Sequence, residues 1–271
     1  MRLHLTKHHG LGNDFFVVLG SPAADRPALA RTLCDRRRGI GADGLLIATD
    51  EAGYTARMTL YNADGSIGAM SGNGIRCFAQ AIAMRDGSLA DQYILTDSGP
   101  RTVELRATDR DDTIEASVDM GEVATIDAPP RWDDLGCEPG RPVAHLSLGN
   151  PHSVVGTDDV QAVDLLAIGR QVPDTNLEIV EPTEQPRTIR MRVHERGAGI
   201  TEACGTGACA SAWAARTWGF VPAQSSEVIV EMDGGRATVV FDRPTPGRVT
   251  LRGPSVFIAR LAVDLTDGDV T

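Results

Sequence analysis

Short apolar runs rich in β-branched residues, separated by Gly, Pro and Asp turns, recur along the whole chain. Runs of this length between such turns predict β-strands. They fall at residues 15–19, 45–48, 58–61, 93–96 and 103–107 in the first half, and at 143–147, 177–180, 188–193, 227–231 and 237–241 in the second. A further run at 256–263 predicts a final strand, which we place with the first half.

Each half also predicts two helices of different character. Residues 26–37 and 160–171 are apolar on one face only, as is typical of surface helices. Residues 75–84 and 208–218 follow a Gly-x-Gly and are apolar almost all round. A helix that is apolar on every side is buried. We therefore predict an α+β fold of two pseudo-symmetric lobes, each a curved antiparallel sheet wrapped around a central helix.

The two halves repeat one another at a nearly constant spacing. The matched pairs are Gly12-Asn13 with Gly149-Asn150, residues 43–45 with 175–177, Asn62 with Glu195, and residues 71–74 with 204–207. Four matches in the same order indicate a duplicated unit. We expect an N-terminal lobe over 1–122, with 256–271 returning to it, and a C-terminal lobe over 123–255.

Composition excludes several classes of protein. The chain has 271 residues and a formal net charge of −11, which disfavours nonspecific binding to nucleic acid. No apolar run is long enough for a membrane helix, and the first residues do not form a signal peptide. We therefore expect a cytoplasmic protein. Lys7 is the only lysine, so a pyridoxal-phosphate Schiff base is not expected.

Five cysteines at irregular spacing fit neither a disulfide framework nor a zinc site. They are Cys34, Cys77, Cys137, Cys204 and Cys209. Four are interpreted as small buried hydrophobic residues. The histidines His8, His9 and His194 show no ligand spacing, so no metal site is expected.

Cys204 stands apart because of its place in the repeat. Ser71-Gly72 and Cys204-Gly205 each begin a buried helix, and we expect these two N-termini to face each other across a cleft. Helix N-termini offer free N–H groups and partial positive charge, which favours a carboxylate ligand. The same field is expected to lower the pKa of the Cys204 thiol.

Polar residues at strand ends complete the candidate site. Five amides lie at such positions: Asn13, Asn62, Asn73, Asn150 and Asn176. Glu195 could hold an ammonium group and Arg196 a carboxylate, although a surface ion pair is the alternative for these two. His152 lies close enough in sequence to Asn150 to tune a nearby thiol.

Six segments together resemble the diaminopimelate epimerase family. They are Asn13-Asp14-Phe15, residues 39–44 (GIGADG), 62–66 (NADGS), 70–77 (MSGNGIRC), 149–152 (GNPH) and 195–207 (ERGAGITEACGTG). The resemblance spans about residues 7–210. It implies a cofactor-independent isomerase that interconverts L,L- and meso-2,6-diaminopimelate, an amino-acid substrate of lysine biosynthesis. The family commonly dimerises, which leaves a homodimer open for this chain.

The resemblance also implies roles for the site residues. In the family, two cysteines exchange a proton with the α-carbon from opposite faces, as inversion of a stereocentre requires. The distal end of the substrate would be held by Asn62, Asn150, Asn176 and Arg196. Its reacting carboxylate would be bound by Gly72, Asn73, Gly205 and Thr206. Glu195 would contact the reacting ammonium, His152 would lie near the catalytic position of the first lobe, and Asn13 would line the cleft.

One catalytic position departs from the family pattern, because Ser71 stands where the family has its first cysteine. A serine hydroxyl is a far weaker acid than a thiol and is seldom a useful base without help. Cys77 lies nearly two turns further along the predicted helix and is no substitute. Three interpretations stay open: an introduced Cys→Ser substitution in an epimerase, a natural one-base racemase or dehydratase of another amino acid that uses Ser71 and Cys204, or an amino-acid-binding protein without turnover.

Overall fold

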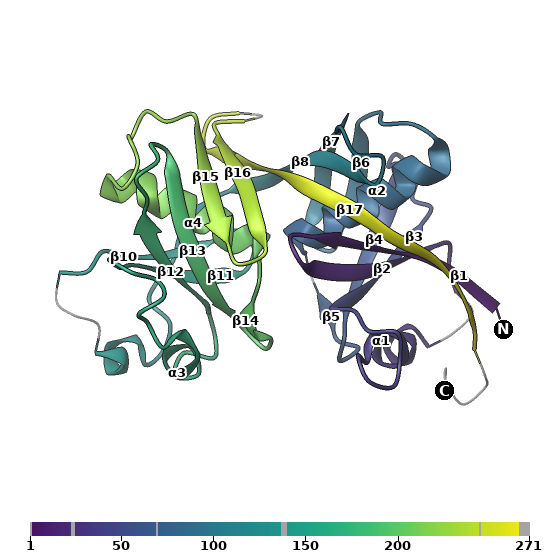
Figure 1. Cartoon of the computed structure of the whole chain (residues 1–271), viewed down its shortest axis with the longest axis horizontal. Coiled ribbons are helices and arrows are strands. Elements are labelled where there is room, and N and C mark those ends of the chain that lie inside the picture. Colours follow the sequence, from purple (N-terminus) through teal and green to yellow (C-terminus); the bar gives the residue numbers. More distant parts are fainter. Residues whose placement is uncertain (1, 23–24, 69, 137–139, 244, 266–271) are drawn as a thin grey trace. The chain divides into compact units, whose positions relative to one another are not determined.

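A computed structural model describes residues 2–22, 25–68, 70–136, 140–243 and 245–265. Cys137 lies outside these residues. The chain forms two compact units (Figure 1). Unit 1 holds the chain up to Val118 and from Gly253 onward, and unit 2 holds Asp119–Arg252.

Unit 1 begins with β1, and the chain passes from it into unit 2 along β8. Its elements are β1 (Arg2–Gly10), β2 (Asn13–Leu19), α1 (Arg26–Cys34), β3 (Gly44–Thr49), β4 (Ala56–Asn62), β5 (Ile67–Gly68), α2 (Gly72–Asp86), β6 (Gln92–Thr96), β7 (Gly99–Ala107) and β8 (Thr113–Glu122).

Unit 2 follows, and the chain returns from it along β17. Its elements are β9 (Ala124–Thr125), the 3-10 turn η1 (Trp132–Leu135), β10 (Val143–Ser147), β11 (Pro151–Gly156), α3 (Leu165–Gly169), β12 (Asn176–Pro182), β13 (Thr188–Glu195), β14 (Gly199–Thr201), α4 (Gly205–Trp218), β15 (Glu227–Met232) and β16 (Gly235–Phe241). The last strand, β17 (Arg248–Asp264), begins in unit 2 and belongs to unit 1 from Gly253 onward.

The strand pairing of unit 1 recurs in unit 2 in the same order. In unit 1, β1–β2, β3–β4, β4–β5, β6–β7 and β7–β8 are antiparallel, whereas β2–β3 and β4–β6 are parallel. In unit 2, β10–β11, β12–β13, β13–β14, β15–β16 and β16–β17 are antiparallel, whereas β11–β12 and β13–β15 are parallel. The internal duplication predicted from the sequence is therefore confirmed.

Each unit wraps its strands around one central helix, as the all-round apolar segments predict (Figure 1). In α2, every residue from Gly72 to Ala83 is buried. In α4, almost every residue from Gly205 to Ala215 is buried as well. Both helices end at a glycine in the left-handed conformation, Gly87 and Gly219, whose N–H groups cap the final carbonyls. The predicted α+β fold is confirmed.

Some expected details are corrected. The sheets are mixed. Helices α1 and α3 connect the parallel pairs β2–β3 and β11–β12, and α2 and α4 lie in the crossovers that lead to the parallel pairs β4–β6 and β13–β15. The helix expected over 160–171 is only α3, since the Asp164 side chain caps Ala167 N–H and starts the helix there. The Val160 N–H instead donates to Glu181 at 2.7 Å. The helix expected over 26–37 stops at Cys34.

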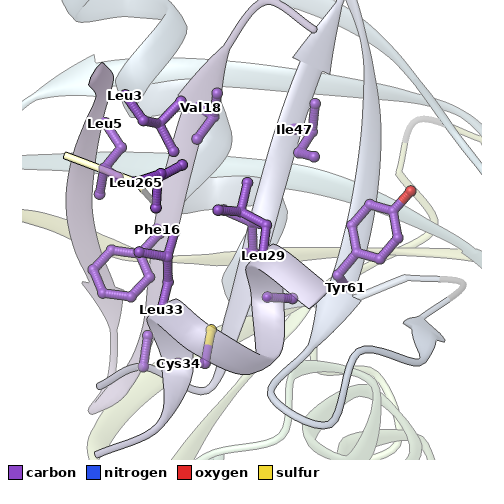
Figure 2. Close-up of a cluster of buried hydrophobic side chains, with 13 residues drawn as sticks. Leu3, Leu5, Phe16, Val18, Leu29, Leu33, Cys34, Ile47, Tyr61 and Leu265 are labelled. Carbon is purple, nitrogen blue, oxygen red and sulfur yellow. The ribbon is translucent and has the colours of Figure 1, made fainter. Parts of the chain in front are cut away.

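A second layer of hydrophobic residues lies under α1 in unit 1 (Figure 2). Leu29 and Leu33 on α1 pack against Phe16 on β2, and all three are at most 2% exposed. Burial of each such side chain is worth about 1.5–3 kcal/mol. Because this layer fixes α1 against the sheet, it also fixes the loop between Cys34 and Gly44 that carries part of the candidate site.

Candidate functional site

The predicted site residues of each unit gather at one end of its sheet. In unit 1, Asn13 starts β2 and Asn62 ends β4. Both strands pair with β3, which runs parallel to β2 and antiparallel to β4. In unit 2, Asn176 starts β12 and Glu195 ends β13. The beginning of one strand and the end of its antiparallel neighbour meet at the same edge. The repeat therefore places each set of polar residues beside the start of its unit's central helix.

Residues 71 and 204 occupy equivalent positions, the N-caps of α2 and α4. Both have extended backbone, with φ −136° at Ser71 and −124° at Cys204. Ser71 Oγ accepts a hydrogen bond from Gly74 N at 3.0 Å, and Cys204 Sγ accepts one from Gly207 N at 3.4 Å. The expected helix starts are confirmed. Each side chain thereby satisfies an N–H group that the helix leaves free.

A chain of amides runs across the site end of unit 1. Arg76, which is fully buried, donates to Asn73 Oδ1 at 2.8 Å and to the Gly72 carbonyl at 3.0 Å. Asn73 donates to Asn13 Oδ1 at 3.2 Å, and Asn13 donates to Asp43 at 2.6 Å. A guanidinium can only donate and a carboxylate only accept. The two ends therefore fix the orientation of both amides between them.

Charged residues hold Asp43, at which this series of hydrogen-bonded amides ends. Arg36 bridges Asp43 at 2.7 Å and Asp14 at 2.6 Å, and Lys7 lies 2.8 Å from Asp14. Burial raises the pKa of Asp14, but the hydrogen bonds from Arg36 and Lys7 outweigh it and hold that pKa below its usual range. Asp14 is therefore an anion that fixes the loop before β3.

Asn62 is exposed at the end of β4. Its side chain donates to Ser66 Oγ at 3.0 Å across the turn that follows the strand. The neighbouring Ala63 N–H donates to the Asp43 carbonyl at 3.1 Å. Asp43 thus connects the turn of Asn62 to the amide chain of Asn13.

In unit 2, a continuous chain of polar side chains leads to Cys204. Asn150 Nδ2 donates to Thr206 Oγ1 at 3.3 Å, which leaves the Thr206 hydroxyl proton free to donate to Cys204 Sγ, 3.5 Å away. The Cys204 thiol in turn hydrogen-bonds to Glu195, which also accepts from Thr201 at 2.5 Å. The sulfur therefore accepts from the Gly207 N–H and lies within hydrogen-bond distance of the Thr206 hydroxyl, with a carboxylate beside it to take its proton.

The electrostatics of Cys204 differ from the sequence-based expectation. Burial raises the pKa of the Cys204 thiol well above its usual value, and the negative charges of Glu195 and Glu178 raise it further. The Thr206 hydroxyl and the Gly207 N–H lower it by less. This direction is opposite to the expected lowering, because burial and the two carboxylates raise the pKa of the thiol by more than the hydrogen bonds at the helix start lower it. Burial likewise raises the pKa of Glu195, which makes it a better proton acceptor.

Asn176 and Arg196 are joined through the backbone. Asn176 Oδ1 accepts from the Arg196 N–H at 2.9 Å, and its Nδ2 donates to the Pro151 carbonyl at 2.9 Å. Asn176 is buried, whereas the Arg196 side chain is exposed. The buried amide therefore holds the turn that presents this guanidinium to solvent.

The other cysteines and histidines behave as structural residues. Cys34, Cys77 and Cys209 are buried, and burial raises the pKa of Cys34 and of Cys77 to about 12. Burial lowers the pKa of His8 to about 4. Among the described residues, no three His, Cys, Asp or Glu side chains are grouped as a metal would require. Within the same residues, no helix is long and apolar enough to span a bilayer.

Sequence reasoning missed three residues that touch the site residues: Arg76, Asp43 and Glu178. Glu178 is fully buried on β12, with Oε1 2.7 Å from His152 Nδ1. A signal was present in the sequence, because Glu178 interrupts the apolar run 177–180 on the same strand face as Asn176. No comparable signal marks Arg76, since arginines near helix starts are usually exposed.

Comparison with known proteins identifies the relatives of this chain. A family model described as "Diaminopimelate epimerase" matches residues 5–126 and 145–258. A diaminopimelate epimerase of Geobacillus kaustophilus is 35% identical over 280 residues, covering 92% of each chain. One of Gloeothece citriformis is 37% identical over 284 residues, covering 94% of this chain and 96% of the relative.

Solved structures share the fold at lower identity. A PhzF-family phenazine biosynthesis protein of Bacillus anthracis has a TM-score of 0.75 at 14% identity, covering 98% of this chain and all of the other. A hydroxyproline epimerase of Agrobacterium vitis has a TM-score of 0.69 at 15% identity, covering 98% of this chain and 93% of the other. At these identities, the likeness supports the fold alone.

Proposed function

The chain belongs to the diaminopimelate epimerase family, and from this premise we propose that it interconverts L,L- and meso-2,6-diaminopimelate without a cofactor. The observation that carries the proposal is the environment of Cys204. Its thiol caps a buried helix, accepts a hydrogen bond from Gly207 N–H, contacts the Thr206 hydroxyl and interacts with the Glu195 carboxylate. A group that must give and take one proton needs these partners.

The proposed proton transfer uses Cys204 and Glu195 as a pair. The Cys204 proton moves to the Glu195 carboxylate, and the Thr206 hydroxyl and Gly207 N–H stabilise the thiolate that remains. The thiolate then takes the substrate α-proton, and the electron pair of the broken C–H bond stays on the α-carbon. A proton delivered to the opposite face gives the inverted centre. N–H groups at a helix N-terminus stabilise the negative charge that spreads into the α-carboxylate.

The remaining residues are proposed to bind substrate by position in the family pattern. The reacting carboxylate is assigned to Gly72, Asn73, Gly205 and Thr206, and the distal end to Asn62, Asn150, Asn176 and Arg196. Glu195 receives the reacting ammonium, while Asn13 and His152 complete the lining. Three amides and one guanidinium at the distal end suit a ligand with a second amino-acid group.

Ser71 limits the rate on the opposite face. Its hydroxyl holds its proton far more tightly than a thiol does, and its oxygen already accepts from Gly74 N. We therefore expect slow epimerisation, while Cys204 alone still exchanges the α-proton of one stereoisomer with solvent.

Proton exchange in D₂O tests the proposed function. Purified chain is incubated with L,L- or meso-diaminopimelate, and loss of the α-proton signal is followed by ¹H NMR. Ser71→Cys is expected to raise turnover by about two orders of magnitude or more, and Cys204→Ala to abolish exchange. Cys209→Ala, on the same helix but fully buried, is the matched control.

Other outcomes would assign a different function. If Ser71→Cys leaves the rate flat while Cys204→Ala abolishes it, a one-base reaction replaces the two-base one. If neither isomer exchanges, calorimetry with diaminopimelate against proline and hydroxyproline distinguishes a binding protein from an enzyme of another amino acid.

The family premise also supports a place in lysine biosynthesis, a cytoplasmic location and a homodimer. Complementation of a strain that requires added diaminopimelate tests the first. Fractionation of cells that express the chain tests the second, and light scattering of the purified protein tests the third.

A further inference from the structure

A buried carboxylate on β12 holds the histidine that begins the hydrogen-bond chain to Cys204. Glu178 and His152 are both fully buried, and Glu178 Oε1 lies 2.7 Å from His152 Nδ1. Among the residues that the structure describes, Glu178 Oε2 has no hydrogen-bond partner. A buried carboxylate oxygen without a protein hydrogen-bond partner is costly. The position therefore calls for an explanation beyond packing.

The other ring nitrogen of His152 also faces an acceptor. His152 Nε2 lies 3.1 Å from Asn150 Oδ1, while Asn150 Nδ2 donates onward to Thr206. A carboxamide oxygen can only accept, so Nε2 must carry a proton. Nδ1 faces a carboxylate oxygen. Both ring nitrogens therefore point at acceptors, which is the hydrogen-bonding pattern of an imidazolium ion.

We propose that Glu178 is a positioning residue that keeps His152 as an imidazolium and aims its Nε2–H at Asn150. The orientation of His152 sets the direction of every hydrogen bond from Asn150 to Cys204. Asn150 presents its NH₂ group to Thr206, and Thr206 presents its hydroxyl proton to the Cys204 sulfur. The last step, stabilisation of a catalytic thiolate, rests on the proposed function.

Glu178 packs closely against the first turn of α4. A Cβ at Gly207, in the first turn of α4, would lie 2.5 Å from Glu178 Oε1. The glycine therefore lets the carboxylate approach the helix that Cys204 caps. The titratable groups that face the pair are Glu195 on β13 and Cys204 at the start of α4. The imidazolium charge opposes those of the two carboxylates near the sulfur.

Side-chain ¹⁵N NMR of histidine tests the proposal without any substrate. It distinguishes an imidazolium from either neutral tautomer, and His152→Gln assigns the signal among the six histidines. In the unsubstituted chain at about pH 7, both ring nitrogens of His152 are expected to carry a proton, because each faces an acceptor. In Glu178→Gln, which keeps the shape but removes the charge, the ring is expected to carry only one proton at the same pH.

Matched variants separate positioning from simple stability. Glu181→Gln removes another buried carboxylate of the same strand, one that bonds Val160 and Arg190, and should leave the His152 signal unchanged. Glu178→Asp keeps the charge and serves if Glu178→Gln does not fold. A neutral His152 in the unsubstituted chain, or an imidazolium that persists in Glu178→Gln, overturns the proposal.

Proton exchange gives the second readout. In Glu178→Gln, exchange of the diaminopimelate α-proton should stay near the parent rate at about pH 6 and fall about tenfold relative to it by about pH 8. A purely structural role would lower the rate equally at all pH values, and that result would overturn the positioning role. Absence of exchange in the unsubstituted chain would contradict the proposed function but leave the NMR result intact.

Discussion

Replacing Glu195 by Gln should raise the fraction of Cys204 that is present as thiolate at a fixed pH. The carboxylate hydrogen-bonds to the thiol, and its negative charge holds the pKa of Cys204 up. A unit charge about 4 Å away is worth about 4 kcal/mol at an effective dielectric constant of about 20. Glu195 is half-buried, and His152 and Thr201 oppose its charge, so we expect roughly 1.5–2 kcal/mol. This corresponds to about a 10–30-fold larger thiolate fraction at a fixed pH.

Alkylation of Cys204 by iodoacetamide measures the thiolate directly. The rate is followed by mass spectrometry of the peptide that contains residue 204, between about pH 7 and pH 9. Gln can still accept from the thiol, so the geometry is retained. Glu202→Gln, which removes an exposed carboxylate two residues from Cys204, is the control. An unchanged or slower rate in Glu195→Gln, or an equal gain in Glu202→Gln, would refute the electrostatic reasoning.

Three further predictions concern stability and binding. His8 has a pKa lowered to about 4 from 6.5, so the unfolded state takes up the proton first as pH falls. Neutral His8 therefore contributes its full share to the free energy of unfolding above about pH 6.5, and this share falls by up to about 3 kcal/mol toward pH 4. In urea unfolding, His8→Gln should lose most of this pH dependence. Gly207→Ala should lower the free energy of unfolding by about 1–3 kcal/mol, because the added methyl group overpacks against Glu178. Gly74→Ala should lower it by less, since the nearest atom to the added Cβ is 3.1 Å away. Equal melting temperatures of the two variants would contradict this. Asp43→Asn removes the carboxylate that fixes the orientation of the Asn13 amide, so the affinity for diaminopimelate measured by calorimetry should fall several-fold. An unchanged affinity would show that Asp43 does not support binding.

The sequence by itself determined the repeated architecture. All-round apolar helices after Gly-x-Gly and short apolar runs between turns depend on local patterns, which are readable along the chain. The same local signals placed Ser71 and Cys204 at helix starts, because an N-cap is defined by its immediate neighbours. They failed over 160–171, where the Asp164 cap and the distant carboxylate of Glu181 decide where the helix begins.

Only the tertiary structure decided the charge state of the site. Sequence position gives Cys204 the field of a helix N-terminus, which favours a thiolate. Glu178 and Glu195 come from two other strands, β12 and β13, and their charges reverse that preference once burial removes water from around the sulfur. Electrostatic energy depends on distance in space and on local dielectric, and neither can be read from spacing along the chain.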